Sequence, residues 1–255
     1  HTLQVSDSLW LNRSFKEAYR QKIIETPLRD RRYRYSCVGF ILLQQLVEAR
    51  TGMSMDAFLE QEFYAPMGLK RTGYLPLRGA ATAGTAYAGI VSGSHAPLSK
   101  AEIIPSSFDP FLRKTVLQGF VHDESAAFQG NAGLFSNATE VARIYQMLLN
   151  GGELDGKRYL SPETCRVFTT TVSRISRRGL GFDKPDRQNP AKSPCAAATP
   201  STVYGHTGFT GTCAWVDPTN GLVYVFLCNR IYPNVWNTKL MKMDIRTRIQ
   251  EVMYQ

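Results

Sequence analysis

The stretch Gly205-His206-Thr207-Gly208-Phe209-Thr210-Gly211 lies where the sequence changes to strand periodicity. Its residues Gly205–Thr207 form the end of a predicted strand, Val203–Thr207. Two further strands are predicted over Thr212–Val216 and Leu222–Leu227. The segment Asp217-Pro-Thr-Asn-Gly221 separates the last two strands and is typical of a hairpin turn. These segments predict an antiparallel meander with a histidine and a threonine at the end of its first strand.

Helical patterns occupy most of the chain before this sheet, and one more follows it. Two N-termini carry clear capping signals: Asn137 with Glu140 three residues later, and Ser161 followed by Pro162. The expected helices are Phe15–Ile24, one with apolar residues from Phe40 to Val47 that stops at Gly52, one that starts after Ser54 and ends before Pro66, one capped by Asn137, one that begins at Ser161, and one from about Thr238 to Met253.

This order of elements determines the predicted fold class. Helices come first, then the antiparallel strands and then a helix that covers them, which is an α+β arrangement rather than alternating βαβ units. We expect a mainly helical region over residues 31–170, and the sheet strands with the C-terminal helix over residues 200–255. Residues 78–107 and 183–202 are predicted loops, because small, polar and proline residues dominate them. The whole of 1–255 is expected to form one domain.

Composition and charge exclude several classes of protein. The 255 residues are enough to bury a sizeable core, and no run approaches the roughly 18 apolar residues of a membrane helix. Lys and Arg total 30 against 21 Asp and Glu, a net charge of +9, but no zinc-finger, basic-zipper or RNP motif accompanies the positive charge. The five cysteines form no Cys-x-x-Cys pair. We therefore expect no membrane span, no nucleic-acid partner and no structural metal.

Common catalytic signatures are also missing from the sequence. Gly151–Lys157 has the spacing of a phosphate-binding loop, but Arg158 stands where that motif needs Ser or Thr, so a turn is the better interpretation. The sequence contains no His-Glu-x-x-His, no Gly-x-Ser-x-Gly and no Gly-x-Gly-x-x-Gly.

One more motif, Tyr35-Ser36-Cys37, stands directly before an apolar helix. Taken alone, Tyr35 would be a half-buried aromatic at a helix start and His206 a hydrogen-bonded polar group in a sheet. Taken together, the two motifs resemble signature elements of the penicillin-recognising serine hydrolases: class C β-lactamases, low-molecular-weight penicillin-binding proteins and related esterases. The resemblance runs from about Leu28 to the C-terminus. Three further stretches carry it: Ala65-Pro66-Met67-Gly68-Leu69, Trp215-Val216-Asp217-Pro218 and Val225–Asn229.

The resemblance implies a β-lactamase/transpeptidase-like fold and acyl-enzyme chemistry on an amide or ester, without a metal or cofactor. It assigns catalytic roles to Tyr35, as proton acceptor for a nucleophilic serine, and to His206, as a cation. Substrate binding falls to Thr207, Gly208 and Phe209, whose N–H would form half of an oxyanion hole. Cys37 also lies in this substrate-binding set, at a position where the family has Asn or Asp.

The family's Ser-x-x-Lys nucleophile motif is absent, because none of the ten lysines has Ser or Thr three residues before it. The sequence therefore predicts a domain that is incomplete on its N-terminal side, and a chain that is inactive alone. The intact enzyme would act on a β-lactam, a cell-wall peptide or an ester, at a periplasmic or other extracytoplasmic location in a bacterium. The chain also resembles modules fused C-terminally to bacterial family 3 glycoside hydrolases. The alternative is therefore a non-catalytic binding or scaffolding module attached to a glycosidase domain.

Overall fold

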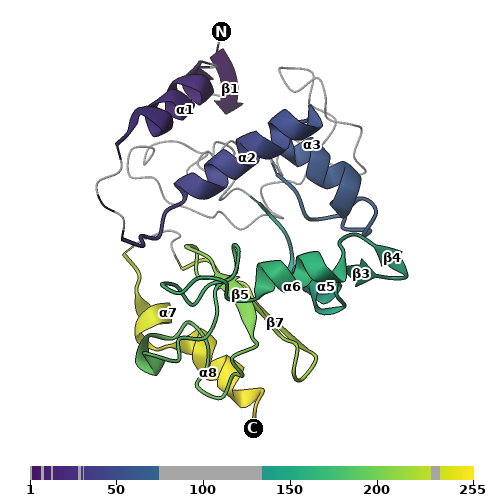
Figure 1. Ribbon diagram of the computed structural model, residues 1–255, viewed down its shortest axis with the longest axis vertical. Helices are drawn as coiled ribbons and strands as arrows, with labels where there is room; N and C mark the ends of the chain where they lie inside the picture. The colour runs from purple at the N-terminus through teal and green to yellow at the C-terminus, as the bar shows by residue number, and fades with distance from the viewer. Residues whose placement is uncertain are drawn as a thin grey trace. The chain divides into compact units, whose positions relative to one another are not determined.

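A computed structural model describes residues 2–6, 9–12, 14–27, 30, 32–74, 134–230 and 236–255 (Figure 1). The predicted loop over residues 78–107 lies outside these residues. The chain divides into two compact units, His1–Ser136 and Asn137–Gln255. The single domain over 1–255 stays a prediction.

The first unit begins with a hairpin that the sequence patterns did not indicate, in which β1 (Thr2–Ser6) pairs antiparallel with β2 (Leu9–Asn12). The predicted helices follow as α1 (Phe15–Glu25), α2 (Val38–Thr51) and α3 (Met55–Leu59). The chain continues from α3 without a break into the π-helical turn η1, Glu60–Tyr64.

Helix α2 ends as predicted at Gly52, whose φ of 69° is left-handed and suits a residue without a Cβ. The buried residues of this unit are mostly apolar and lie on α2, on α3 and in the segment that follows: Ile41, Ala57, Tyr64, Met67 and Leu69.

The second unit contains α5 (Ala138–Leu149), the two-residue strands β3 (Glu153–Leu154) and β4 (Lys157–Arg158), α6 (Pro162–Thr169) and the 3₁₀ turn η5 (Pro190–Lys192). Both capping predictions are confirmed: the Asn137 side chain accepts from the Glu140 N–H at 2.9 Å, and Ser161 Oγ accepts from the Thr164 N–H at 3.0 Å. The segment between α6 and the sheet is irregular apart from short turns, as predicted for residues 183–202.

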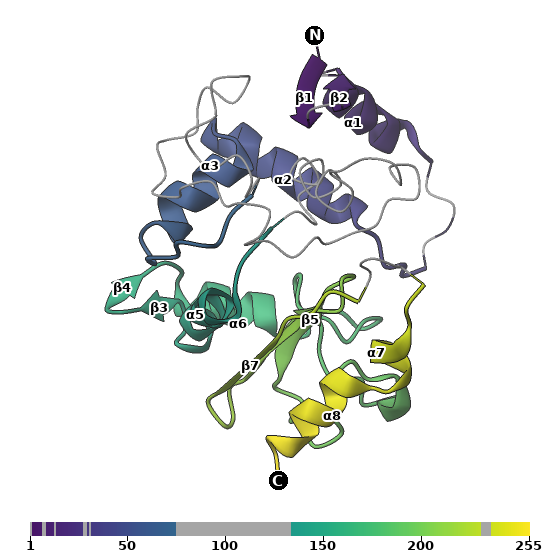
Figure 2. The same cartoon turned by 180° about the vertical axis from the view of Figure 1, so that it is seen from behind.

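The predicted meander is the three-stranded antiparallel sheet of this unit, in the order β5 (Tyr204–Thr207), β6 (Cys213–Asp217), β7 (Leu222–Phe226). Every residue of the central strand β6 is buried. Figures 1 and 2 show the sheet between α5 on one side and α8 (Ile245–Val252) on the other, and α5 packs on β6 and β7. One hydrophobic cluster joins the strands to the preceding loop: Cys195, Val203, Cys213, Trp215 and Tyr224.

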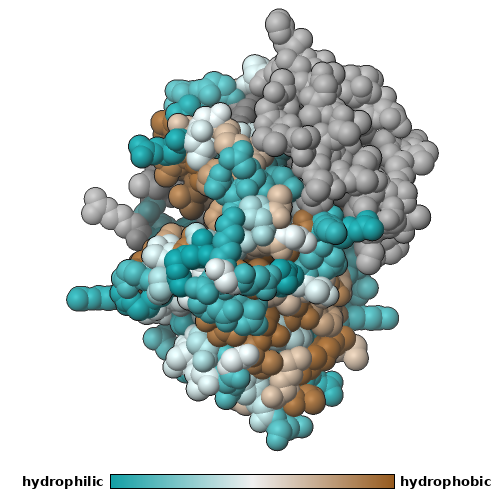
Figure 3. Space-filling model, turned by 90° about the vertical axis from the view of Figure 1, so that its right-hand side faces the viewer, coloured by the Kyte–Doolittle hydropathy of each residue, from teal (hydrophilic) through white to brown (hydrophobic). Residues whose placement is uncertain are grey.

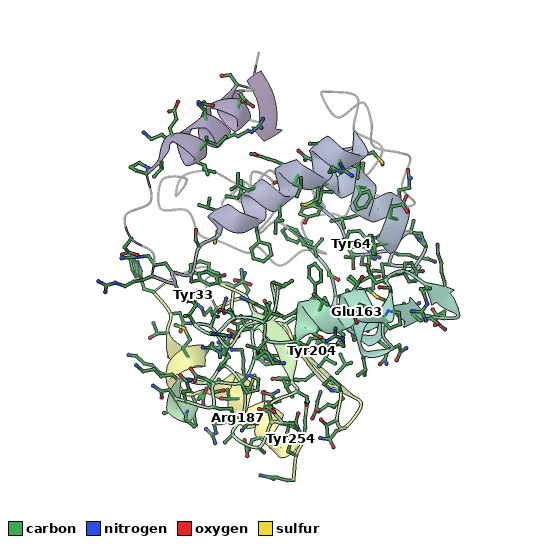
Figure 4. The ribbon with its side chains drawn as sticks, viewed as in Figure 1. Tyr33, Tyr64, Glu163, Arg187, Tyr204 and Tyr254 are labelled. Carbon is green, nitrogen blue, oxygen red and sulfur yellow. The ribbon has the colours of Figure 1, made fainter. Side chains whose placement is uncertain are left out.

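The prediction of one C-terminal helix over about 238–253 is wrong. The chain forms α7 (Lys239–Lys242) and α8, which are separated where Asp244 adopts a left-handed φ of 51°. The break redirects the chain so that α8 can dock on the sheet, where the Tyr224 hydroxyl donates to Arg246 O at 3.0 Å. Tyr254, labelled in Figure 4, donates to Asp217 Oδ2 at 2.9 Å and fixes the end of this segment.

Apolar side chains remain exposed in both units, among them Leu43 and Leu46 of α2 and Val252 of α8. Figure 3 shows hydrophobic atoms reaching the surface of the described part of the molecule. Exposed residues of this kind are common in globular proteins, so they do not by themselves indicate a binding surface.

Candidate active site

The motif that begins at Gly205 forms the end of β5 and the turn into β6. The Gly208 N–H donates to Thr212 O at 2.7 Å, and the Gly211 N–H donates to Gly208 O at 3.0 Å, which closes the turn. A Cβ at Gly205 would collide with the carbonyl of Ala214 on β6, and one at Gly208 would collide with the Thr212 hydroxyl. The glycines of this motif therefore allow close approach of the strands.

His206 lies between a backbone acceptor and an arginine. Its Nδ1 is 2.7 Å from Thr207 O, and its Nε2 is 3.4 Å from Nη1 of Arg178. Arg178 belongs to the irregular segment between α6 and β5, and sequence reasoning did not connect it with the site. The adjacent arginines 177 and 178 were the only signal, and a charged pair in a loop does not reveal which strand it will reach.

Asp183 holds both arginines against β5. Its side chain is 4% exposed, and it accepts from Arg178 Nη2 at 2.8 Å and from Arg177 Nη2 at 3.0 Å. Its backbone forms an isolated antiparallel bridge with Gly205, in which Asp183 N–H donates to Gly205 O at 2.6 Å and Gly205 N–H donates to Asp183 O at 3.1 Å. The carboxylate is therefore anchored to the strand one residue before His206.

An aromatic chain supports the same segment. Phe182 stacks edge-on between Tyr145 of α5 and Tyr204 of β5, with ring centroids 6.5 and 5.4 Å apart. Burial raises the pKa of the Tyr145 phenol to about 12 and also raises the pKa of Tyr204, which is labelled in Figure 4. Both phenols are therefore protonated at neutral pH, and they act as packing groups beside the site.

Phe209 occupies the exposed tip of the turn, with 69% of its surface exposed. Its ring lies 5.1 Å from Cζ of Arg230, whose N–H donates to Thr210 O at 2.9 Å. Across the described residues, the Phe209 N–H has no hydrogen-bond acceptor. A backbone N–H on a rigid, exposed turn can donate to an oxyanion.

Tyr35 and Cys37 lie in the first unit. Tyr35 is 61% exposed, and Cys37 is the exposed N-cap residue of α2. Ser36 Oγ between them accepts from the Val38 N–H at 3.1 Å, which shapes the entry to this helix. The structure thus brings His206, Thr207, Gly208 and Phe209 together in the second unit, whereas their union with Tyr35 and Cys37 in one site stays a prediction.

The described residues provide neither a metal-binding cluster nor a membrane-spanning helix. They contain no group of three His, Cys, Asp or Glu side chains that could hold a metal ion. No helix in the same ranges is long and apolar enough to cross a membrane.

An α+β fold with a Gly-His-Thr-Gly strand end defines a β-lactamase/transpeptidase-like protein. The model of the Beta-lactamase family matches residues 1–240, so the chain belongs to the β-lactamase family. The resemblance to penicillin-recognising serine hydrolases and the predicted fold class are therefore confirmed.

Curated relatives of this chain carry a carboxypeptidase name. The Escherichia coli (strain K12) protein named "Putative D-alanyl-D-alanine carboxypeptidase" is 33% identical over 223 residues, which are 82% of this chain and 48% of that protein. The chain spans about half the length of the curated relatives it matches.

Solved structures show the same fold at lower identity. A penicillin-binding protein homologue from Caulobacter crescentus has a TM-score of 0.54 at 20% identity, covering 84% of this chain and 58% of that one. EstCE1, described as a hydrolase with promiscuous acyltransferase activity, has a TM-score of 0.59 at 16% identity, covering 98% of this chain and 64% of that one.

Proposed function

We propose that this chain is the substrate-binding part of a serine hydrolase that releases the terminal residue of a D-alanyl-D-alanine cell-wall peptide. The observation that carries the proposal is the end of β5, where His206, Thr207 and the Phe209 N–H are presented on one anchored hairpin. The name of the Escherichia coli relative favours a cell-wall peptide over a β-lactam or a simple ester. Such an enzyme would act in the periplasm or at another extracytoplasmic location.

The hairpin supplies two of the functions that acyl transfer needs. When a serine attacks the scissile carbonyl, negative charge develops on the carbonyl oxygen, and the Phe209 N–H can donate to it. Such a donor contributes roughly 3–4 kcal/mol of transition-state stabilisation. The Thr207 hydroxyl can donate to the free carboxylate of the substrate, beside His206. Tyr35 is the proposed acceptor of the serine proton, and Cys37 would line the same site.

The nucleophile is proposed to come from sequence outside these 255 residues. The chain contains no Ser-x-x-Lys, and its curated relatives are about twice the aligned length, which leaves room for that motif. The 255-residue chain is therefore expected to form no acyl-enzyme by itself.

The test compares this chain with a longer protein that includes the upstream sequence. We expect the chain to give no burst with a chromogenic cephalosporin and no labelling by a fluorophosphonate, and the longer protein to release D-alanine from a D-alanyl-D-alanine peptide. In the longer protein, Phe209→Pro removes the N–H and should lower kcat about 100-fold or more. Phe209→Ala keeps the N–H and serves as the matched control.

Two results would contradict the proposal. One is full activity in Phe209→Pro when its circular dichroism spectrum matches that of Phe209→Ala. The other is turnover by the 255-residue chain that disappears when one of its own serines is replaced.

The absence of Ser-x-x-Lys also favours a second candidate, a non-catalytic module that binds a cell-wall ligand or braces a glycosidase domain of the same polypeptide. Upstream sequence distinguishes the two. A glycosidase domain there without Ser-x-x-Lys would support the binding module and exclude the hydrolase.

A further inference from the structure

The contact between Arg178 and His206 joins a loop to the strand that carries the candidate site, although the two residues are 28 positions apart. We propose that Arg178 sets the tautomer of His206 and supplies the positive charge that a substrate carboxylate meets beside Thr207. The inference rests on the proposed function for the identity of the substrate, but the contact itself does not depend on it.

The hydrogen bonds of His206 define which ring nitrogen carries the proton. A guanidinium has donors only, so the 3.4 Å contact with Arg178 uses the lone pair of Nε2. Thr207 O is an acceptor only, so Nδ1, at 2.7 Å, donates its proton to it. One tautomer, protonated on Nδ1 alone, satisfies both contacts. In this arrangement the Arg178 guanidinium provides the positive charge beside the strand.

Arg178 is held rigidly enough to act in this way. Its Nη2 donates to the buried carboxylate of Asp183 at 2.8 Å, and Asp183 is bonded to Gly205 through its backbone in both directions. The turn before Asp183 is closed by the Gly179 N–H, which donates to Phe182 O at 3.0 Å. The Arg178 side chain is nevertheless 25% exposed, so a small anion can reach the guanidinium.

Arginine is also well suited to bind a substrate carboxylate. Its guanidinium stays charged throughout the physiological pH range, and its planar donors match the two oxygens of a carboxylate. Arg178 would thus supply the cation that the family resemblance assigned to His206, and His206 would act as its partner on the strand.

Arg177 provides a matched control within the same cluster. It donates to the same Asp183 carboxylate, but its other bonds run to Asp186 Oδ2 at 3.2 Å and to Lys184 O at 2.9 Å. Arg177→Gln therefore removes an equal charge and a bond to Asp183, and it leaves the contact between Arg178 and His206 in place.

The experiment uses the 255-residue chain with ¹⁵N-labelled histidine and two probes, N-acetyl-D-alanine and its neutral amide. We expect the His206 nitrogens of the wild type to show the Nδ1–H tautomer, and the carboxylate probe to bind more tightly than the amide. Arg178→Gln should change the ¹⁵N pattern to a mixture of tautomers and weaken carboxylate binding about tenfold or more. Arg178→Lys should restore part of the preference, and Arg177→Gln should keep both the tautomer and the preference.

Three results would overturn the inference: a wild type that binds the carboxylate no better than the amide, an Arg178→Gln variant that binds it as the wild type does, and equal losses in Arg177→Gln and Arg178→Gln. If Arg178→Gln does not fold, Arg178→Lys becomes the test variant. Its ¹⁵N pattern and its carboxylate preference are then compared with those of the wild type. A longer protein without peptidase activity would refute the proposed function alone, because the probes report on carboxylate binding and not on acyl transfer.

Discussion

Replacing Asp183 with asparagine removes a buried negative charge and keeps the size of the side chain. The carboxylate accepts from Arg177, from Arg178 and from the Lys184 N–H at 2.8 Å, so it neutralises two guanidinium groups at once. An asparagine side chain keeps one acceptor oxygen, but its NH₂ group is a donor only. That group would face N–H donors and could not accept hydrogen bonds from them. Asp183→Asn therefore leaves both arginines without the partner that holds them against β5.

The expected loss of stability follows from burial. Breaking a fully buried ion pair costs about 3–5 kcal/mol. The Arg177 and Arg178 side chains are 35% and 25% exposed, so water compensates part of that loss, and we expect about 2–3 kcal/mol. Asp155→Asn is the control, because this carboxylate is 68% exposed and pairs with Arg143 at the surface. Its loss should stay below about 1 kcal/mol.

Thermal unfolding followed by far-UV circular dichroism measures both variants. One kcal/mol corresponds to about 2–4 °C in a domain of this size, so Asp183→Asn should lower the Tm by roughly 4–12 °C. If Asp183→Asn lowers the Tm by less than about 4 °C, or by no more than Asp155→Asn does, the Asp183 cluster does not stabilise the fold as argued, and the reasoning is refuted.

Two further predictions concern packing and pH. Gly205→Ala forces a Cβ into the neighbouring strand and should cost at least about 2 kcal/mol in urea unfolding, whereas Gly39→Ala, in α2 with no atom within 4 Å of the new Cβ, should add about 0.5–1 kcal/mol. Burial raises the pKa of the Cys213 thiol to about 11 and also raises that of Cys195. The unfolded chain loses these protons above about pH 8.5 while the folded chain keeps them, so stability should fall as pH rises from there toward 11, by up to about 1.4 kcal/mol per pH unit and thiol. Urea unfolding at pH 7.5 and 9.5 measures this fall, and iodoacetamide at pH 8 should label the exposed Cys37 before either buried thiol.

Contrary results can be defined for both the packing prediction and the pH prediction. A Gly205→Ala variant as stable as the wild type would contradict the close approach of β5 and β6. Unfolding free energies that do not fall between pH 7.5 and 9.5, or buried cysteines that react as fast as Cys37, would show that the core around Cys213 is open to water.

The sequence alone indicated the elements whose signals are local. The N-caps at Asn137 and Ser161 and the stop at Gly52 depend on residues within one helical turn, and the turn after Asp217 depends on five consecutive residues. The resemblance to the family rested on the order of short motifs, which the family match over residues 1–240 confirms.

The prediction of one continuous C-terminal helix failed because the outcome depends on contacts between distant segments. Asp244 interrupts the predicted C-terminal helix so that α8 can meet the sheet, and its sequence pattern carries no sign of that docking.

The candidate site likewise combines residues that local sequence predicts with residues that only tertiary contacts bring in. The local sequence around Gly-His-Thr-Gly was enough to predict that His206 and Thr207 lie at the end of a strand. Strand β5 confirms this prediction. Only the folded chain shows that Asp183 pairs with Gly205 and that Arg178 then reaches His206 across 28 residues. The physical reason is that a strand end is specified by local backbone preferences, whereas an ion-pair partner is chosen by whichever loop the packed core brings within hydrogen-bonding distance.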